Sequence, residues 1–346
     1  MTWVPLLLAD RSACLRILVL TELLGRSADD IEVVELRSVQ GDDVLISTLL
    51  KSQSQDGSWK DVDSRAGSTE GGRLRATAFA LMRLGYVGLD GEHPAVRRGI
   101  EFMFASMKGN GSWPMPKVYD GVAEPRRGYT MTPLQTSIPL LAVASVGCAT
   151  DPRAEQAYDW LLEQRLDDGA WPAGKIGKVY GYQAGYRQVP HSRWGCRTNT
   201  TLALTCLALH PTRRTGTAAR RALDLLLARE TRDRQNLGFN VARVVGAEPQ
   251  RGAMTYHARF DPALILDLCW RVGAARTDER VDDLVRWVVE QQGPYGLWEY
   301  GPKPEASRWV SFDVLRSLSR LDSSTDWLSS EPRTPYVSYP KKPRRF

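Results

Sequence analysis

The chain has 346 residues, 42% of them hydrophobic, and its 46 basic and 40 acidic side chains give a net charge of +6. That length allows one large repeat domain or two ordinary domains. No stretch approaches the roughly 18 apolar residues that span a bilayer, and the basic residues are scattered instead of forming the stripe that nucleic-acid binding needs. We therefore expect no transmembrane segment and no nucleic-acid partner.

The five cysteines form no C-x-x-C pair, so they predict neither a disulfide framework nor a zinc ribbon. The apolar start, residues 3–9, is short and lacks the positively charged lead of a secretion signal. A reducing cytoplasm is the expected location.

Residues 1–40 are predicted to form N-terminal helices. One lies near residues 10–25, where apolar residues recur at helical spacing, and a second begins at Asp29-Asp30 and ends near residue 39. We expect these helices to complete the core of the fold or to cover it as a lid.

Residues 41–325 repeat one pattern of helix, Gly-x-aromatic turn, loop and helix. The turns are Gly57-Ser-Trp59, Gly111-Ser-Trp113, Gly169-Ala-Trp171, Gly238-Phe239 and Gly296-Leu-Trp298. They recur at intervals of about 54 to 68 residues, the length of two helices with their connections. Glycine permits the tight reversal, and the aromatic side chain is expected to pack beneath it.

The helices between these turns alternate in character. One class is amphipathic, at 42–53, 94–107, 151–165, 216–230 and 277–292, and the other is almost uniformly apolar, at 76–84, 133–146, 200–209, 262–270 and 310–321. Helices that are apolar all round are enclosed, whereas amphipathic ones face solvent. The pattern predicts an all-α fold of two concentric rings, an (α/α)6 barrel or alpha-alpha toroid, in effectively one domain. An open solenoid is the alternative, although it would leave one face of each inner helix wet.

Long insertions follow the aromatic turns at 114–132, 172–194 and 240–256. Loops of that length in a compact domain are usually functional or disordered, and we expect these at one end of the barrel. Residues 326–346 form a basic C-terminal tail, which we expect to be a solvated end.

Two of the turns carry a family resemblance. Gln53-x3-Gly57-x-Trp59 and Gln292-x3-Gly296-x-Trp298 match the Q-x3-G-x-W turn of squalene and oxidosqualene cyclases and related terpene cyclases. The alternating rings also resemble the β subunits of protein prenyltransferases. The likeness covers roughly residues 40–321 and implies an alpha-alpha toroid that acts on a hydrophobic isoprenoid.

The catalytic motifs of those families are missing from the sequence. There is no D-x-D-D, whose middle Asp protonates an alkene in class II cyclases, and Asp61-Val-Asp63 is only a truncated echo of it. There is no D-D-x-x-D to hold magnesium on a diphosphate, so magnesium is expected only with a diphosphate substrate. Asp267-Leu-Cys269 resembles a prenyltransferase zinc pair, but no histidine follows His257 to complete it. We expect no bound metal or cofactor.

Three acids on inner helices are the candidate proton donors: Asp267, Asp261 and Asp313. A carboxyl group in an apolar run such as 262–270 is costly to ionise, and a raised pKa is what alkene protonation needs. Each acid also has a structural interpretation. Asp267 and Asp313 are spaced to pair with Arg271 and Arg316, and Asp261 is placed to cap a helix that begins with proline.

A substrate-binding cavity is predicted around the starts of the inner helices. Aromatic faces stabilise carbocations, and the candidates for that wall are Trp194, Tyr256, Phe260, Trp309 and Phe312. His257 is a candidate proton carrier, and Arg197 and Arg259 are candidate anion-binding residues. Core packing or a solvated loop position is the alternative for each.

The sequence therefore favours a terpene cyclase-like enzyme, which cyclises or isomerises an isoprenoid by Asp protonation in an aromatic-lined cavity. Peripheral contact with a membrane is compatible with such a substrate. A non-catalytic binding or scaffold protein that keeps the toroid is the first alternative. A carbohydrate-active (α/α)6 enzyme, which would need paired carboxylates or a Tyr/His/Arg cluster, is the second.

Overall fold

The computed structural model describes residues 3–60, 70–113, 132–176, 179–181, 187–228, 232–249, 259–321 and 335. Over these residues the chain is mostly helical. Its strands there, β1 (Lys175–Ile176) and β2 (Val179–Tyr180), form a short antiparallel pair. Asp61 and Asp63, Tyr256, His257 and nearly all of the C-terminal tail lie outside the described residues.

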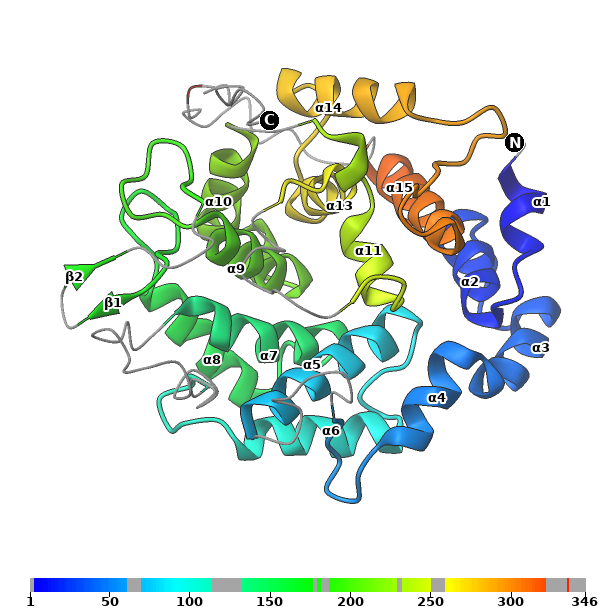
Figure 1. Ribbon diagram of the computed structural model, residues 1–346, viewed down its shortest axis with the longest axis horizontal. Helices are drawn as coiled ribbons and strands as arrows, with labels where there is room; N and C mark the ends of the chain where they lie inside the picture. Colours follow the sequence, from blue (N-terminus) through cyan, green and yellow to red (C-terminus); the bar gives the residue numbers. More distant parts are fainter. Residues whose placement is uncertain are drawn as a thin grey trace, which may run out of the picture.

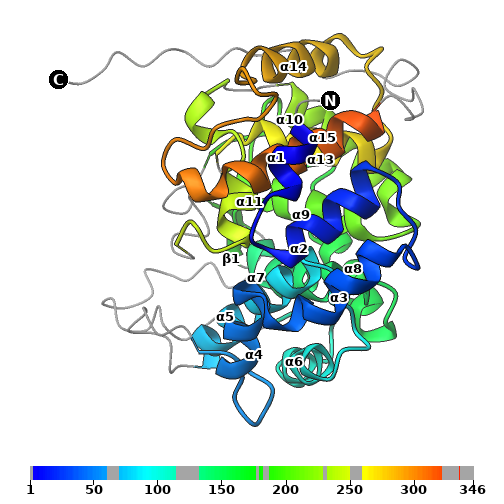
Figure 2. The ribbon, with the colours of Figure 1, turned by 90° about the vertical axis from the view of Figure 1, so that its right-hand side faces the viewer.

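Two rings of helices surround a common core (Figure 1). The inner ring consists of α2 (Ala13–Leu18) with its π-helical continuation η1 (Val19–Leu23), α5 (Glu70–Tyr86), α7 (Pro133–Ser145), α9 (Arg197–Leu209), α13 (Pro262–Val272) and α15 (Ser307–Leu321). The outer helices are α3 (Ile31–Val39), α4 (Val44–Ser52), α6 (Pro94–Ala105), α8 (Pro152–Glu163), α10 (Thr217–Leu227) and α14 (Glu279–Glu290). The short helix α1 (Trp3–Leu8) precedes α2 on the same side of the molecule (Figure 2).

The inner helices follow one another around the ring. α5 contacts α7, α7 contacts α9, α9 contacts α13, α13 contacts α15, and α15 contacts η1. The last contact brings the N-terminal segment beside the last inner helix, which an open solenoid would not do. The predicted alpha-alpha toroid is confirmed.

Four Gly-x-Trp turns connect the outer helices α4, α6, α8 and α14 to the inner helices that follow them. The indole Nε1 of Trp59, Trp113, Trp171 and Trp298 donates to the carbonyl ten residues earlier, at 2.7–2.8 Å. The backbone N–H of the same tryptophans donates to a hydroxyl on the following inner helix, from Thr77, Thr136, Thr200 and Ser311. These four tryptophans are buried, so their role in the turns is structural.

The turn at Gly238-Phe239 departs from this pattern. It opens a further short helix, α11 (Phe239–Val244), in a stretch predicted to be loop. α11 lies inside the ring in Figure 1 and contacts α5, α13 and α15. It ends beside the last turns of α5, where Arg83 Nε donates to the Val244 carbonyl at 2.8 Å.

Candidate functional site

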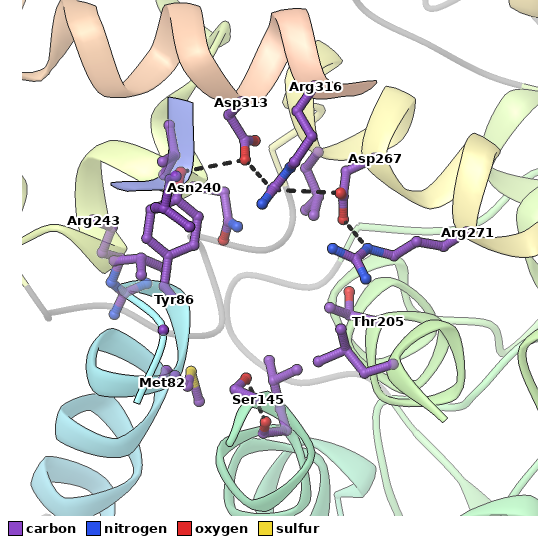
Figure 3. Close-up of a pocket in the computed structure, with 18 of the residues that line it drawn as sticks. Met82, Tyr86, Ser145, Thr205, Asn240, Arg243, Asp267, Arg271, Asp313 and Arg316 are labelled. Carbon is purple, nitrogen blue, oxygen red and sulfur yellow. Dashed lines mark hydrogen bonds and ion pairs between the residues drawn. The ribbon is translucent and has the colours of Figure 1, made fainter. Parts of the chain in front are cut away.

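A cavity of about 310 Å³ lies inside the ring, against the middle and C-terminal turns of the inner helices. Figure 3 looks into it. Helix α11 forms part of its wall through Asn240, Val241 and Arg243. The cavity therefore depends on a helix that breaks the sequence repeat.

The wall of the cavity has two different sides. Apolar side chains come from α5, α7, α11 and α13, at Phe79, Met82, Leu141, Val241 and Leu264. Charged side chains come mainly from η1, α13 and α15, at Glu22, Asp267, Arg271, Asp313 and Arg316. Such a cavity can hold an apolar body against one side while ionisable groups meet it from the other.

Asp313 lies on α15 at the charged side, and it is buried. Its Oδ1 accepts hydrogen bonds from the Arg316 guanidinium, one helical turn away, and from the Tyr86 hydroxyl at 3.3 Å. Burial raises the pKa of Asp313 to about 6, because its loss of hydration outweighs the opposing charge of Arg316. The pKa of Asp313 thus lies closer to neutral pH than that of an exposed aspartate.

Asp267 lies on α13, next to Asp313 around the ring (Figure 3). Arg271 Nε donates to its Oδ2 at 2.7 Å, Trp270 Nε1 donates to its Oδ1 at 3.1 Å, and Arg316 Nη2 lies 3.7 Å from Oδ1. Burial alone would raise the pKa of Asp267, but the charges of Arg271 and Arg316 hold it below its ordinary value. At the pH at which Asp313 becomes protonated, Asp267 therefore remains ionised.

Arg316 joins the two acids to the N-terminal segment. Besides Asp313 and Asp267, its guanidinium lies 3.6 Å from Glu22 of η1, which also accepts a 2.9 Å bond from Arg320. Burial alone would lower the pKa of Arg316, but the surrounding carboxylates raise it. The group that separates Asp313 from Asp267 is thus a permanent cation.

Tyr86 ends α5 and closes the cavity opposite Arg271 (Figure 3). Its ring packs on Trp309 with centroids 5.9 Å apart, and Arg316 lies 5.8 Å from the ring centre. Burial and the Asp313 charge raise the pKa of Tyr86, so its hydroxyl is a donor to Asp313 at neutral pH.

The structure brings two of the three predicted acids together. Asp267 and Asp313 line the cavity with the arginine partners that the sequence spacing indicated. Asp261 caps two helices instead: its Oδ1 accepts from Ala263 N at 3.0 Å and Gly238 N at 2.9 Å, and its Oδ2 from Asn240 N at 2.6 Å. Burial raises the pKa of Asp261 to about 6 as well, although this residue does not line the cavity.

The described aromatic and cationic candidates gather around the starts of the inner helices. The guanidinium of Arg197 lies 5.2 Å from the Phe260 ring centre, and that of Arg259 lies 4.3 Å from the Phe239 ring centre. The ring centres of Trp194 and Tyr180 are 6.4 Å apart. Phe312 is fully buried, with its ring centre 5.2 Å from the Arg316 guanidinium, and the Trp309 ring packs against that of Tyr86. The cavity wall is formed by residues further along the helices.

The cavity residues that sequence reasoning missed include Glu22, Tyr86, Asn240 and Arg243. Tyr86 and Glu22 lie near the ends of apolar helices. Polar residues are common there, so their sequence positions did not indicate a site. Arg243 is 2% exposed and lies 5.0 Å from the Phe79 ring centre. The one signal available for it was the turn at Gly238, where Asn240 occupies the tryptophan position of Gly-x-Trp and the aromatic residue, Phe239, comes one residue earlier.

Within the described ranges no group of three or more His, Cys, Asp or Glu side chains is arranged to hold a metal ion. A search of the described helices for one that could cross a bilayer finds none.

No protein-family model matches the chain, and no curated protein matches it. Among solved structures, a protein from Actinoplanes is similar over 89% of this chain and 90% of its own, with 17% identity and a TM-score of 0.45. A variant of the type II terpene cyclase MstE from Scytonema, in complex with its product merosterolic acid A, is similar over 80% of this chain and 94% of its own. Its identity is 16% and its TM-score 0.37.

Another MstE variant, in complex with the substrate geranylgeranyl dihydroxybenzoate, has 15% identity and a TM-score of 0.33, over 79% of this chain and 94% of its own. At such identities and TM-scores these likenesses carry no argument about reaction or substrate. The function is therefore inferred from the residues of the cavity.

Proposed function

We propose that this protein is a terpene cyclase-like enzyme that binds an isoprenoid in the cavity and begins its cyclisation or isomerisation by protonating a double bond. The observation that carries the proposal is Asp313: a buried carboxyl group with a raised pKa, on the wall of a partly open cavity that also presents apolar side chains such as Phe79, Met82 and Leu141. A general acid needs a pKa close to the working pH.

The chemistry uses the side chains already present. The O–H bond of protonated Asp313 breaks as its proton forms a C–H bond with one alkene carbon, which leaves a cation on the other carbon. The Tyr86 ring and the carboxylate of Asp267 border the same space (Figure 3), and both favour positive charge. A second double bond of the isoprenoid can then attack the cation and close a ring.

The size and lining of the cavity limit the range of possible substrates. Ligand pockets commonly have volumes of about 300–1,000 Å³, so a cavity of about 310 Å³ suits a short isoprenoid. Protonation as the first step requires no metal, and in this proposal magnesium would serve only a diphosphate substrate. Asp261, bonded to three backbone N–H groups, has a structural role.

A non-catalytic scaffold is the second candidate, and a specific observation favours it. Asp267 and Asp313 both have the ion pairs expected of purely structural acids. Removal of one member of a buried ion pair is costly, whatever its function. Only an activity measurement separates the two candidates.

The test is turnover of geraniol, farnesol and geranylgeraniol, and of their diphosphates with and without magnesium, followed by gas chromatography and mass spectrometry. We expect the full-length wild type to consume at least one substrate, and Asp313→Asn to reduce turnover by about 10²–10⁴-fold, the usual contribution of a general acid.

The matched control is Asp283→Asn, which removes an exposed acid paired with Arg232 and Arg286, and it should keep wild-type turnover. A wild type that consumes none of the panel, or an Asp313→Asn variant as active as the wild type, would contradict the proposal.

A further inference from the structure

Two carboxyl groups on neighbouring inner helices share one arginine. Arg316 contacts Asp313 on its own helix and lies 3.7 Å from Asp267 on α13. Both acids line the cavity. Their environments shift their pKa values in opposite directions, which is how acid and base roles are divided between paired carboxyl groups.

The contacts of Asp267 suit an ionised base, and those of Asp313 suit a protonated acid. Asp267 receives donors on both oxygens, from Trp270 on Oδ1 and from Arg271 on Oδ2, and these bonds favour the carboxylate. The hydrogen bonds of Asp313 with described residues, from Arg316 and Tyr86, meet Oδ1. Its Oδ2 is therefore the oxygen suited to carry a proton.

We infer that Asp267 is the catalytic base that ends the reaction that Asp313 begins, by removing a proton from the final carbocation. This inference rests on the proposed function. Arg271 and Arg316 act on it as positioning residues, because they hold the carboxylate ionised without themselves taking part in proton transfer.

One proton enters the substrate and one leaves it over the proposed reaction. Asp313 gives one proton to an alkene carbon at the start. At the end Asp267 takes one proton from a carbon next to the cationic centre, and the electron pair of that C–H bond becomes the new double bond. The product is an isomer of the substrate, and after product release water in the open cavity carries the proton from Asp267 back to Asp313. A weakly basic carboxylate suffices, because a proton beside a carbocation is far more acidic than a carboxylic acid.

Two neighbouring groups are poorer candidates for this base. The Tyr86 hydroxyl is protonated because its pKa is raised, and it donates to Asp313. Glu22 is more exposed than Asp267, with 29% of its side chain accessible against 13%, and it is held by Arg320. Asp267 is the more deeply enclosed carboxylate.

The experiment measures product ratio instead of rate, because any change near Arg316 also alters Asp313. Farnesol, or another member of the panel if the wild type consumes it faster, is incubated with the full-length protein, and products isomeric with the substrate and products heavier by one water are quantified by mass spectrometry. The isomer forms when a base removes the last proton, whereas the hydrated product forms when water adds to the cation and then loses a proton. We expect Asp267→Asn to lower the isomer-to-hydrate ratio at least about tenfold, since a positioned base contributes about 10²–10⁴-fold.

Asp283→Asn is the control. It also removes a carboxylate paired with two arginines, Arg232 and Arg286, but it lies outside the cavity lining, so it should keep the wild-type ratio. If Asp267→Asn does not fold, Asp267→Glu retains the charge and displaces the base by one methylene, and its ratio should fall in the same direction. A wild-type ratio in whichever of these two variants folds, with turnover present, overturns this inference alone. Absence of turnover in the wild type overturns the proposed function and this inference together.

Discussion

Asp313 and Asp267 show how the number of partners sets the ionisation of a buried acid. Both are almost removed from water and both approach Arg316. Asp267 has a second cation, Arg271, and a hydrogen bond from Trp270 as well. Asp313 has only a tyrosine hydroxyl besides Arg316 among the described residues. Desolvation therefore prevails at Asp313, and charge pairing prevails at Asp267.

This difference predicts the pH dependence of the reaction. Protonated Asp313 is the active form, and its pKa is raised to about 6, so kcat/KM for a neutral isoprenoid should fall about tenfold per pH unit above that value. Below it the rate should level off, because Asp267 remains ionised. A profile of kcat/KM between pH 4.5 and 8.5 measures this, at pH values where circular dichroism shows the protein folded. A rate that rises with pH across this range would contradict the assignment of Asp313 as the acid.

At the scale of elements, the Gly-x-Trp turn is the unit that repeats. Gly57 and Gly111 have φ values of +85° and +84°, and a Cβ added to them would lie 2.3 Å and 2.4 Å from backbone carbonyl oxygens of Arg98 and Gln156. The turn of one repeat thus packs against the backbone of the next outer helix. Glycine is required there both for its backbone conformation and for its size.

We predict that Gly111→Ala destabilises the protein by at least about 1–2 kcal/mol, the cost of a left-handed conformation for an alanine, with a further cost from the contact with Gln156. Gly109→Ala is the control in the same turn, because a Cβ there meets nothing within 4 Å. It should change stability by no more than about 0.5 kcal/mol. Urea unfolding of the two variants measures the difference, and equal midpoints would contradict this account of the turn.

The sequence was sufficient to predict the alternating helices of the two rings, because each of them is buried in a regular way. The apolar run at 133–146 became α7 (Pro133–Ser145), and the amphipathic run at 94–107 became α6 (Pro94–Ala105). Helix α11 was missed because it is short and lies in a stretch that the periodicity assigned to a loop.

The candidate site was only partly predictable for a related reason. Asp267 and Asp313 stood out as acids in apolar runs, and that signal is local. The repeat also identified the inner helices, but it gave no information on where along them the interior stays open. That depends on α11, and the aromatic candidates such as Trp194 and Phe260 were therefore placed around the helix starts, away from the cavity.

At the scale of the whole molecule, the ring sets the size of the substrate. The cavity of about 310 Å³ is bounded by helices from every part of the chain. Met82, on α5, lies on its apolar side, whereas Met103, on α6, is fully buried in the core between the rings. The two methionines offer a matched pair for testing the volume of the cavity.

We predict that the wild type prefers geraniol or farnesol to geranylgeraniol by at least about tenfold in kcat/KM, since each methylene that does not fit a hydrophobic pocket costs about 1–3 kcal/mol. Met82→Ala should enlarge the cavity and shift the preference toward geranylgeraniol. Met103→Ala should be destabilised to a similar degree, by about 2–5 kcal/mol, and keep the wild-type preference. An equal shift in both variants would show that loosened packing, and not this cavity, selects the chain length.

The pairing of Glu22 with Arg320, 298 residues further along the chain, also has a consequence for biosynthesis. The inner helix that holds Glu22 therefore leaves the ribosome well before the helix that completes its ring. Buried residues of that earlier helix, such as Leu15, Leu18 and Val19, lack this partner until α15 has been translated. Such exposed apolar surface promotes aggregation, so the nascent chain is a natural client of ribosome-associated chaperones until α15 has emerged.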